Sequence, residues 1–520
     1  MVEKTREKDS RWLLLPIILI IVIVATLIIN LNSIDDSAEK VAGTIILDNG
    51  DEDINWERYK TIDIELSESY RITKSGIYHL TGSLNDGSII VATSKDDVVK
   101  LILDNVTIKN SSGPAISCLE SDDLVIELVG ESYIEDGLNY STALDEDIKG
   151  TLYSKADLTI EGDGSLEIIG NHEDGIISKD DLKIKSGTYI INVADDAIRG
   201  KDSVYVQDGN FTIKSTADAI KSTNETKAGK GFVVIEGGTF NIEAGAKGIK
   251  AINSILISGG TFNIDSYDDA IHSNNYVGIE DGKFKIVSGD DGIHADKELI
   301  VDGGTIDIEK SYEALEAQVV TINDGKISLV ASDDGINAGG GADSSSKNRM
   351  GANPFDADES CVLTINGGDI YINAAGDGVD SNGYLYFNGG KVIVDGPTND
   401  GNGALDSGMD IVMNGGEVIA LGAAGMAKSL GTSSTVYNVS IYFSSVELAG
   451  TKFEIKDSEG ETILEHMSAK SFNHIAVGSE QLIPTKTYTI YIDDEEYEDF
   501  TVSSIVTTVG NSYDIMKKRR

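Results

Sequence analysis

The chain has 520 residues, with 87 Asp and Glu against 42 Lys and Arg, which gives a formal net charge of −45. This charge excludes nucleic acid as a partner, because the phosphates would be repelled, and it favours divalent cations. The length exceeds one ordinary globular core and suits a repeat protein with small flanking units. The two cysteines, Cys118 and Cys361, form no CxxC pair, so a zinc or redox motif of that kind is absent.

The N-terminus carries a predicted membrane anchor. Four basic residues lie within residues 1–11, and an apolar run follows from Trp12 to Ile29. That run is long enough to cross a bilayer, and the basic tail should stay in the cytoplasm. We therefore predict a single-pass membrane protein with a transmembrane helix at 12–31, a linker at 32–50 and the bulk of the chain outside the cell. Cleavage of the segment as a signal peptide is the alternative, and it would make the protein secreted.

A repeat of about 22 residues predicts the fold of residues 51–433. One copy reads Asp-Asp-Ala-Ile-His-Ser at 268–273, and the next reads Asp-Asp-Gly-Ile-His-Ala at 290–295. Between copies, apolar and polar residues alternate, which is typical of strands and not of helices. Three short strands and three turns per copy predict an all-β parallel β-helix. Residues 51–170 match the repeat less well, and we expect irregular coils and an N-terminal cap there.

Two further columns recur with the repeat. An inward aliphatic column should stack at about 4.8 Å per coil and build the core, and each member follows a Gly or Ala for which a larger side chain would clash. A glycine turn also precedes one strand of each copy. The aliphatic column is Ile176, Ile198, Ile220, Ile249, Ile271, Ile293, Leu315, Ile336 and Val379. The glycines are Gly187, Gly209, Gly238, Gly260, Gly282, Gly304, Gly325, Gly368, Gly390 and Gly416.

Two insertions interrupt the repeat, and it ends near residue 434. Insertions lie near Ser222–Gly231 and at Gly339–Glu359, the second of them polar and rich in glycine. From about residue 434 the strands become longer. We predict a small β-sandwich-like domain at 434–513 that caps the open end of the solenoid, because an exposed coil edge would aggregate. A basic tail follows at 514–520.

The acidic half of the repeat predicts calcium. Carboxylates stacked about 5 Å apart repel one another, so a column of them raises its pKa values or recruits cations. Calcium suits clusters of carboxylates and carbonyls better than magnesium or zinc does. The alternative is that these aspartates accept hydrogen bonds from backbone amides of the turns. The predicted ligands are Asp195, Asp196, Asp218, Asp268, Asp269, Asp290, Asp291, Asp333 and Asp334.

A second polar column lies three residues after each acidic position. Alternation should point its side chains outward beside the aspartates, with the sign changing from basic to acidic along the chain. A sugar also needs a flat surface, which an exposed tyrosine can supply. The alternative is a set of surface ion pairs, each worth little. The predicted polysaccharide-binding residues are Arg199, Lys221, Lys250, His272, His294 and Tyr267.

Several runs resemble a family of bacterial carbohydrate-binding-domain proteins, namely Ile177–Leu182, Ile198–Ser203 and Ile220–Thr223, together with the closing segment Thr485–Gly510. The resemblance spans roughly residues 50–510. It implies a right-handed parallel β-helix similar to pectate-type polysaccharide lyases, with bound calcium. It also implies binding of cell-wall polysaccharides such as cellulose or polygalacturonate, without established lyase activity.

Three functions remain open from the sequence. The first is a non-catalytic, calcium-dependent, extracellular protein that binds an acidic pectate-like polysaccharide or cellulose. The second is a calcium-dependent polysaccharide lyase that works by β-elimination, with Lys221, Lys250 or Arg199 as the base. The third is a surface stalk or adhesin that calcium rigidifies. A net charge of −45 leaves few spare cations for a lyase cleft, which favours binding.

Overall fold

The computed structural model describes residues 54–145, 147–339 and 357–510. The predicted transmembrane helix at 12–31, the linker at 32–50, the tails at 1–11 and 514–520 and most of the Gly339–Glu359 insertion lie outside these residues. Within the described ranges, no helix is both long enough and apolar enough to span a bilayer.

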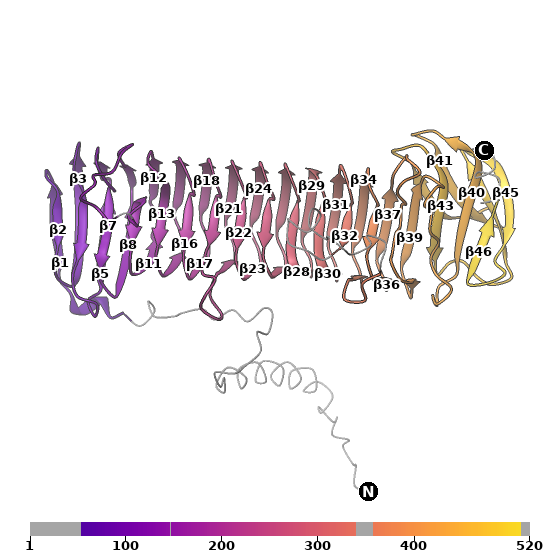
Figure 1. Ribbon diagram of the computed structural model, residues 1–520, viewed down its shortest axis with the longest axis horizontal. Coiled ribbons are helices and arrows are strands. Elements are labelled where there is room, and N and C mark those ends of the chain that lie inside the picture. Colours follow the sequence, from indigo (N-terminus) through magenta and orange to yellow (C-terminus); the bar gives the residue numbers. More distant parts are fainter. Residues whose placement is uncertain (1–53, 146, 340–356, 511–520) are drawn as a thin grey trace, which may run out of the picture. The chain divides into compact units, whose positions relative to one another are not determined.

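The described residues form an all-β parallel solenoid of about 15 turns, in which the strands succeed one another in chain order (Figure 1). Each regular coil contributes one strand to each of three parallel ladders, and every ladder pairs residues of adjacent coils in register. Before the first strand, the described residues form the short 3-10 helix η3 (Trp56–Arg58). The three-strand coil predicted from the repeat is confirmed.

The first ladder carries the aliphatic column of the repeat. Its strands are β2 (Tyr70–Ile72), β4 (Ile89–Ala92), β7 (Ile116–Glu120), β10 (Gly150–Ser154), β13 (Asp174–Ser178), β16 (Ile198–Gly200), β19 (Ile220–Ser222), β22 (Ile249–Ala251), β25 (Ile271–Ser273), β28 (Ile293–Val301), β30 (Leu315–Ile322), β32 (Ile336–Ala338) and β35 (Val379–Ser381). In β28 and β30 the strand continues around the corner into the second ladder.

The second ladder begins with the first strand of the described chain. Its strands are β1 (Thr61–Leu66), β3 (Gly76–Leu84), β5 (Val99–Asp104), β8 (Asp123–Val129), β11 (Asp157–Glu161), β14 (Asp181–Ile184), β17 (Ser203–Val206), β20 (Phe232–Ile235), β23 (Ser254–Ile257), β26 (Tyr276–Ile279), β33 (Val362–Ile365), β36 (Tyr384–Phe387) and β38 (Ile411–Met413).

The third ladder follows the glycine turns. Its strands are β6 (Thr107–Lys109), β9 (Glu131–Glu135), β12 (Ser165–Gly170), β15 (Thr188–Val193), β18 (Asn210–Ser215), β21 (Thr239–Ala244), β24 (Thr261–Ser266), β27 (Lys283–Ser288), β29 (Thr305–Ser311), β31 (Lys326–Ala331), β34 (Asp369–Ala374), β37 (Lys391–Asp395) and β39 (Glu417–Gly422). The ten predicted turn glycines all have positive φ, between 78° and 142°, which a side chain would strain.

The coils before residue 170 continue the same ladders, so the separate N-terminal cap expected there is not needed to describe them. Ile89, Ile116 and Leu152 pair in one line with Ile176. The steps between these residues are 27, 36 and 24, against 22 in the later coils. Loops of varying length therefore hide the repeat in the sequence while the strands keep their register.

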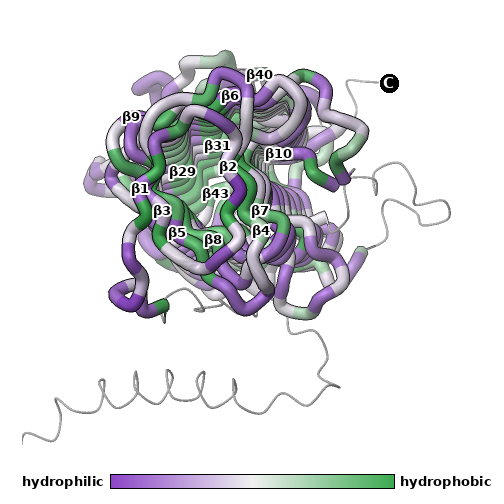
Figure 2. The backbone as a smooth tube through the Cα atoms, turned by 90° about the vertical axis from the view of Figure 1, so that its left-hand side faces the viewer, coloured by the Kyte–Doolittle hydropathy of each residue, from purple (hydrophilic) through white to green (hydrophobic). Residues whose placement is uncertain are grey.

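The core runs along the axis of the solenoid. All nine residues of the predicted aliphatic column are fully buried, and Figure 2 shows hydrophobic residues gathered toward the interior of the stacked coils. At Gly175 a Cβ would lie 2.6 Å from the Ala197 carbonyl oxygen of the next coil, so even an alanine there would require the backbone to shift. The alanines at this position in other coils, such as Ala197 and Ala219, are fully buried, which leaves no room for a larger side chain.

An aromatic stack lies in the interior of the third ladder, and the repeat analysis did not single it out. Tyr189, Phe211, Phe240, Phe262 and Phe284 occupy the same position in successive coils, and their rings stack nearly parallel with centroids 4.9, 4.7, 4.7 and 4.7 Å apart. Offset or parallel ring contacts of this kind add to the burial of the rings themselves. The spacing also measures the height of one coil.

Beyond the last coil the chain forms two facing sheets with their own apolar core. In the first sheet β43 (Phe472–Ser479) pairs antiparallel with β39 and β40 (Asn438–Glu447), and β40 pairs with β46 (Val506–Val509). Pairing with β43 covers the edge that the third ladder would otherwise expose. The second sheet has the order β42 (Thr462–Met467), β41 (Lys452–Asp457), β44 (Thr487–Ile492) and β45 (Glu495–Thr501).

Candidate functional site

The second acidic residue of each repeat lies in the turn that leads into the first ladder, and together these residues form what we call the acidic ladder. One side-chain oxygen is used to hold adjacent coils together: Asp174 Oδ1 accepts the Asp196 N–H at 3.1 Å, and Asp269 Oδ1 accepts the Asp291 N–H at 2.9 Å. Hydrogen bonding to turn amides is thus confirmed for one oxygen of these carboxylates. The ladder comprises Asp174, Asp196, Asp218, Lys247, Asp269, Asp291, Glu313, Asp334 and Asp377.

The companion column lies three residues later and stacks in register beside the acidic ladder, as predicted. In the N-terminal coils its cations bind the carboxylates. Arg199 is 2.7 Å from Asp174 Oδ2, and Lys221 is 3.2 Å from Asp196 and 2.9 Å from Asp218. The companion column is Ile177, Arg199, Lys221, Lys250, His272, His294, Glu316, Asn337 and Asp380.

Lys247 stands where every other copy has an acidic residue, and it reverses the local charge. Its Nζ is 2.5 Å from Asp269 Oδ2 and 3.1 Å from Asp268 Oδ1. Because a lysine cannot accept the amide hydrogen bond of the ladder, Asp268 Oδ1 accepts the Asp269 N–H instead, at 3.0 Å. The neighbouring Lys250 takes part in no ion pair recorded for the described residues.

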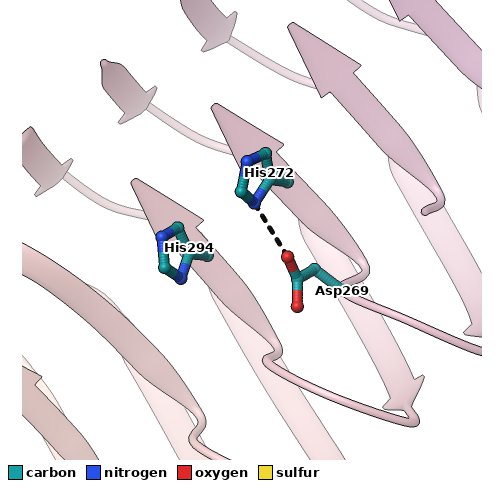
Figure 3. Close-up of side chains that lie close together, drawn as sticks. All are labelled: Asp269, His272 and His294. Carbon is teal, nitrogen blue, oxygen red and sulfur yellow. Dashed lines mark hydrogen bonds and ion pairs between the residues drawn. The ribbon is translucent and has the colours of Figure 1, made fainter. Parts of the chain in front are cut away.

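Two stacked histidines continue the companion column, 4.8 Å apart, with Asp269 beside them (Figure 3). His272 Nδ1 is 2.8 Å from Asp269, while His294 lies 3.1 Å from Asp291 and 2.6 Å from Glu316. Burial alone would lower the pKa of His294, but hydrogen bonds to carboxylates outweigh it and raise the pKa. His294 is therefore an imidazolium that serves as a counter-ion. The two rings are only 4% and 1% exposed, which leaves little surface for a sugar.

After His294 the companion column changes sign, and we call the following carboxylates the acidic end. Burial, together with Asp380 and Asp377, raises the pKa of Asp334 to about 8. Burial and nearby carboxylates raise the pKa of Asp380 to about 7 and that of Asp377 to about 6. Burial raises the pKa values of Glu313 and Glu316 as well. The acidic end comprises Glu313, Glu316, Asp334, Asp377 and Asp380.

Asn337 adds a neutral oxygen to the acidic end. Its Nδ2 donates to Glu313 Oε2 at 2.9 Å, whereas its Oδ1 is buried and accepts no hydrogen bond from any described residue. A buried acceptor without a donor costs free energy unless a cation or water meets it. Carboxylate and amide oxygens are the ligand types that calcium prefers, and Asn337 lies in register between Glu316 and Asp380. The residues present therefore fit a calcium ion here.

The structure divides the predicted calcium ligands into two groups. Asp195 and Asp196 form one trio with Asp174, and Asp268 and Asp269 form another with Asp290. In each trio, one carboxylate oxygen from every residue lies within 4.8 Å of the others. Cations reach both trios: Arg199 binds Asp174 and Asp196, and Lys247 binds Asp268 and Asp269. Asp218 and Asp291 are likewise paired, with Lys221 and His294. Asp334, with Asp333 before it, belongs to the acidic end.

The other members of the acidic end were not among the predicted ligands, because that prediction was based on Asp-Asp doublets. Glu316, Asn337 and Asp380 stand in the companion column, where the sequence shows only their change of sign. That change of sign after His294 is the sequence signal that separates this region from the earlier coils.

A second acidic cluster lies in the turn between the first and second ladders. Burial raises the pKa of Asp157 to about 7. The insertion at 222–231 brings two lysines to this cluster, with Lys227 Nζ 2.6 Å from Asp202 and Lys230 Nζ 2.6 Å from Asp181. The insertion thus supplies its own cations, a role that its sequence alone did not reveal.

A family model described as "Carbohydrate-binding domain-containing protein" matches residues 67–335 and 263–401, which is more than half of the chain. The chain belongs to this carbohydrate-binding-domain family. The resemblance noted in the sequence is therefore confirmed, and the matched ranges contain the whole acidic ladder and its companion column.

Two known proteins are similar to part of this chain. A curated carbohydrate-binding domain-containing protein of Acetivibrio thermocellus is 31% identical over 159 residues, covering 30% of this chain and 54% of the relative. The chain thus matches about half the length of that relative. A solved structure of the polysaccharide lyase-like protein from C. thermocellum, a gadolinium derivative, is 28% identical with a TM-score of 0.35, covering 48% of this chain and 94% of that chain.

Proposed function

We propose that this protein binds polysaccharide through calcium held at the acidic end, outside the cell. The observation that carries the calcium site is the unpartnered Asn337 Oδ1, in a column where Asn337 lies in register between Glu316 and Asp380. Burial and the neighbouring carboxylates raise the pKa of Asp334, so a proton limits the local negative charge when calcium is absent. An ion would replace that proton and relieve the repulsion between neighbouring coils.

The calcium ion also supplies a positive charge that an acidic sugar can bind. A chain with a net charge of −45 repels a polyuronate, whereas calcium at the surface of the solenoid leaves coordination positions for a sugar carboxylate. Family membership supports a carbohydrate as the partner. The remaining parts of the proposal are the right-handed sense of the coil and an N-terminal anchor at 12–31 that displays the solenoid on the cell surface.

The lyase alternative is less well supported by the candidate bases. A lysine or arginine that acts as a general base must first have lost its own proton. Burial lowers the pKa of Lys221, but Asp196 and Asp218 outweigh burial and raise it, so the amine stays charged. The Arg199 guanidinium already binds two carboxylates, those of Asp174 and Asp196. Lys250 is the remaining candidate, and it lies in register between Lys221 and His272.

Calorimetric titration of calcium into the metal-free full-length protein tests the site. We expect binding by the wild type and loss of that binding in the double variant Asp334→Asn, Asp380→Asn. Asp369→Asn is the matched control, because Asp369 is exposed on β34, in the third ladder. Unchanged calcium binding by the double variant would refute the site.

The same protein, incubated with polygalacturonate and calcium, separates binding from cleavage. The proposal predicts no ultraviolet absorbance from unsaturated products, and their appearance would establish the lyase instead. Calcium binding without retention on any polysaccharide would favour the stalk.

A further inference from the structure

The two histidines of the companion column turn the same ring nitrogen toward the acidic ladder. His272 on β25 and His294 on β28 pair in register, and their rings stack (Figure 3). Nε2 of His272 donates to Asn274 Oδ1 at 3.3 Å, and Nε2 of His294 donates to Asp296 Oδ1 at 3.2 Å. Each acceptor stands two residues after its histidine, so both rings keep one orientation, with Nδ1 facing a ladder carboxylate.

Histidines that bind a metal are held in this way. A histidine that binds an ion through one nitrogen almost always donates its other N–H to a carboxylate, a carbonyl or water, which fixes the tautomer and the direction of the ring. Asn274 and Asp296 belong neither to the acidic ladder nor to its companion column. Their contacts are therefore evidence that is independent of the cluster of carboxylates beside Nδ1.

Three possible ligand atoms converge where β28 begins. Nδ1 of His294 lies 3.1 Å from Asp291 Oδ2 and 2.6 Å from Glu316 Oε2. Zinc bonds of about 2.0–2.2 Å place neighbouring ligand atoms about 3.0–3.4 Å apart, so the three atoms have nearly the spacing of a coordination shell. One coil earlier, His272 and Asp269 form a second group with His294, in which one ligand atom from each residue lies within 4.8 Å of the others.

The chemistry and burial of this set favour zinc over calcium. Calcium takes oxygen ligands, whereas imidazole nitrogen together with carboxylate oxygen suits zinc. His272, His294 and Asp291 are buried, as in closed structural zinc sites. The coils on either side place Lys250 and Glu316 in the companion column, so the imidazoles are a feature of these two coils.

We propose that Asp291, His294 and Glu316 bind a zinc ion in the wall of the solenoid. His272 of the preceding coil is the fourth ligand, and the ion thereby joins three successive coils. As the zinc–nitrogen bond forms, the proton on Nδ1 of His294 passes to solvent. The predicted sugar-binding residue Tyr267 is 82% exposed, whereas the histidine ligands are buried, so this ion stabilises the solenoid and does not contact the sugar.

Calorimetric titration of zinc chloride into the metal-free full-length protein, with calcium in excess, tests the site. We expect one zinc ion per chain in the wild type. His294→Gln and His272→Gln should each bind zinc at least about tenfold more weakly, because the loss of an outer-shell partner alone costs that much. His79→Gln is the matched control. His79 also lies between two carboxylates, Asp63 at 2.9 Å and Asp104 at 3.0 Å, but it contacts one with each ring nitrogen.

The calcium-site variant Asp334→Asn, Asp380→Asn distinguishes the two metals. It retains all four zinc ligands, so it should bind zinc like the wild type although it has lost calcium. Loss of zinc binding in this variant would place the ion at the acidic end and overturn the zinc site. Zinc binding by a wild type that binds no calcium would refute the calcium proposal alone.

X-ray absorption by the zinc-loaded wild type identifies the ligands without any substitution, and so it does not depend on the folding of the histidine variants. We expect two imidazoles together with carboxylate oxygens around the ion. A shell of oxygen atoms alone would overturn the site. Equal zinc affinity in the wild type and in His294→Gln, or no zinc binding by the wild type, would overturn it as well.

Discussion

Asp269 and Asp334 occupy the same position of the repeat but have opposite electrostatic surroundings. For Asp269, burial is outweighed by His272 and Lys247, which hold its pKa well below the usual range. For Asp334, burial and neighbouring carboxylates raise the pKa to about 8. A residue's place in the repeat therefore fixes its backbone hydrogen bond, while the neighbouring coils decide whether it needs a further cation.

Asp334→Asn should stabilise the metal-free protein at high pH only. Folding raises the pKa of this carboxyl from about 3.9 to about 8, so its contribution to stability is intact below pH 4 and is lost as the pH rises through 8. Asparagine cannot ionise, yet its Oδ1 can still accept the Asp377 N–H. Urea unfolding without calcium should show a gain of at least about 1.4 kcal/mol at pH 8, the equivalent of one pKa unit, and almost none at pH 4. A gain of equal size at both pH values would contradict this assignment.

Asp269→Ala should be strongly destabilising. The substitution leaves Lys247 and His272 without their shared carboxylate and removes the acceptor of the Asp291 N–H. Breaking a buried ion pair from one side costs about 3–5 kcal/mol. Asp265→Ala, on the exposed face of β24, should change stability by no more than about 0.5 kcal/mol. Similar unfolding midpoints for the two variants would show that the acidic ladder does not hold the coils together.

At the scale of the elements, the repeat predicted the coil with its three strands, its glycine turns and its aliphatic column, because each feature recurs at a fixed spacing. The repeat did not predict the register of the coils around Ile116 and Leu152, because the loops there vary in length although the strands still pair in register. The sequence also did not predict which side chains contact one another across coils. The two lysines of the 222–231 insertion reach carboxylates in earlier coils, and no local pattern encodes that contact.

The aromatic stack provides a test at this scale. Phe240 lies between Phe211 and Phe262 and is fully buried. Phe240→Ala removes two ring contacts and opens a cavity, so it should lower the free energy of unfolding by about 3–5 kcal/mol. Thr239→Ala, on the exposed side of the same strand, is the control and should have little effect. Thermal unfolding that is the same for both variants would show that the stack adds nothing to stability.

At the scale of the molecule, the net charge of −45 is distributed unevenly along the solenoid. Between Arg199 and His294, cationic side chains of the solenoid itself neutralise the acidic ladder. From Glu313 to Asp380 positive charge is sparser: His294 contacts Glu316 at 2.6 Å, and Lys428, which acts on Asp377 and Asp380, is paired with Asp406. We propose that a cation from solution supplies the remaining charge. This asymmetry is the reason for proposing the calcium site at the acidic end and not at the Asp-Asp doublets of the earlier coils.

Retention of the full-length protein on immobilised polygalacturonate, with calcium and with a chelator, tests the central claim most directly. We predict that the wild type is retained with calcium and released by the chelator, and that the variant Asp334→Asn, Asp380→Asn is not retained in either condition. Retention of the wild type in the presence of the chelator, or calcium-dependent retention of the double variant, would contradict calcium-dependent binding at the acidic end.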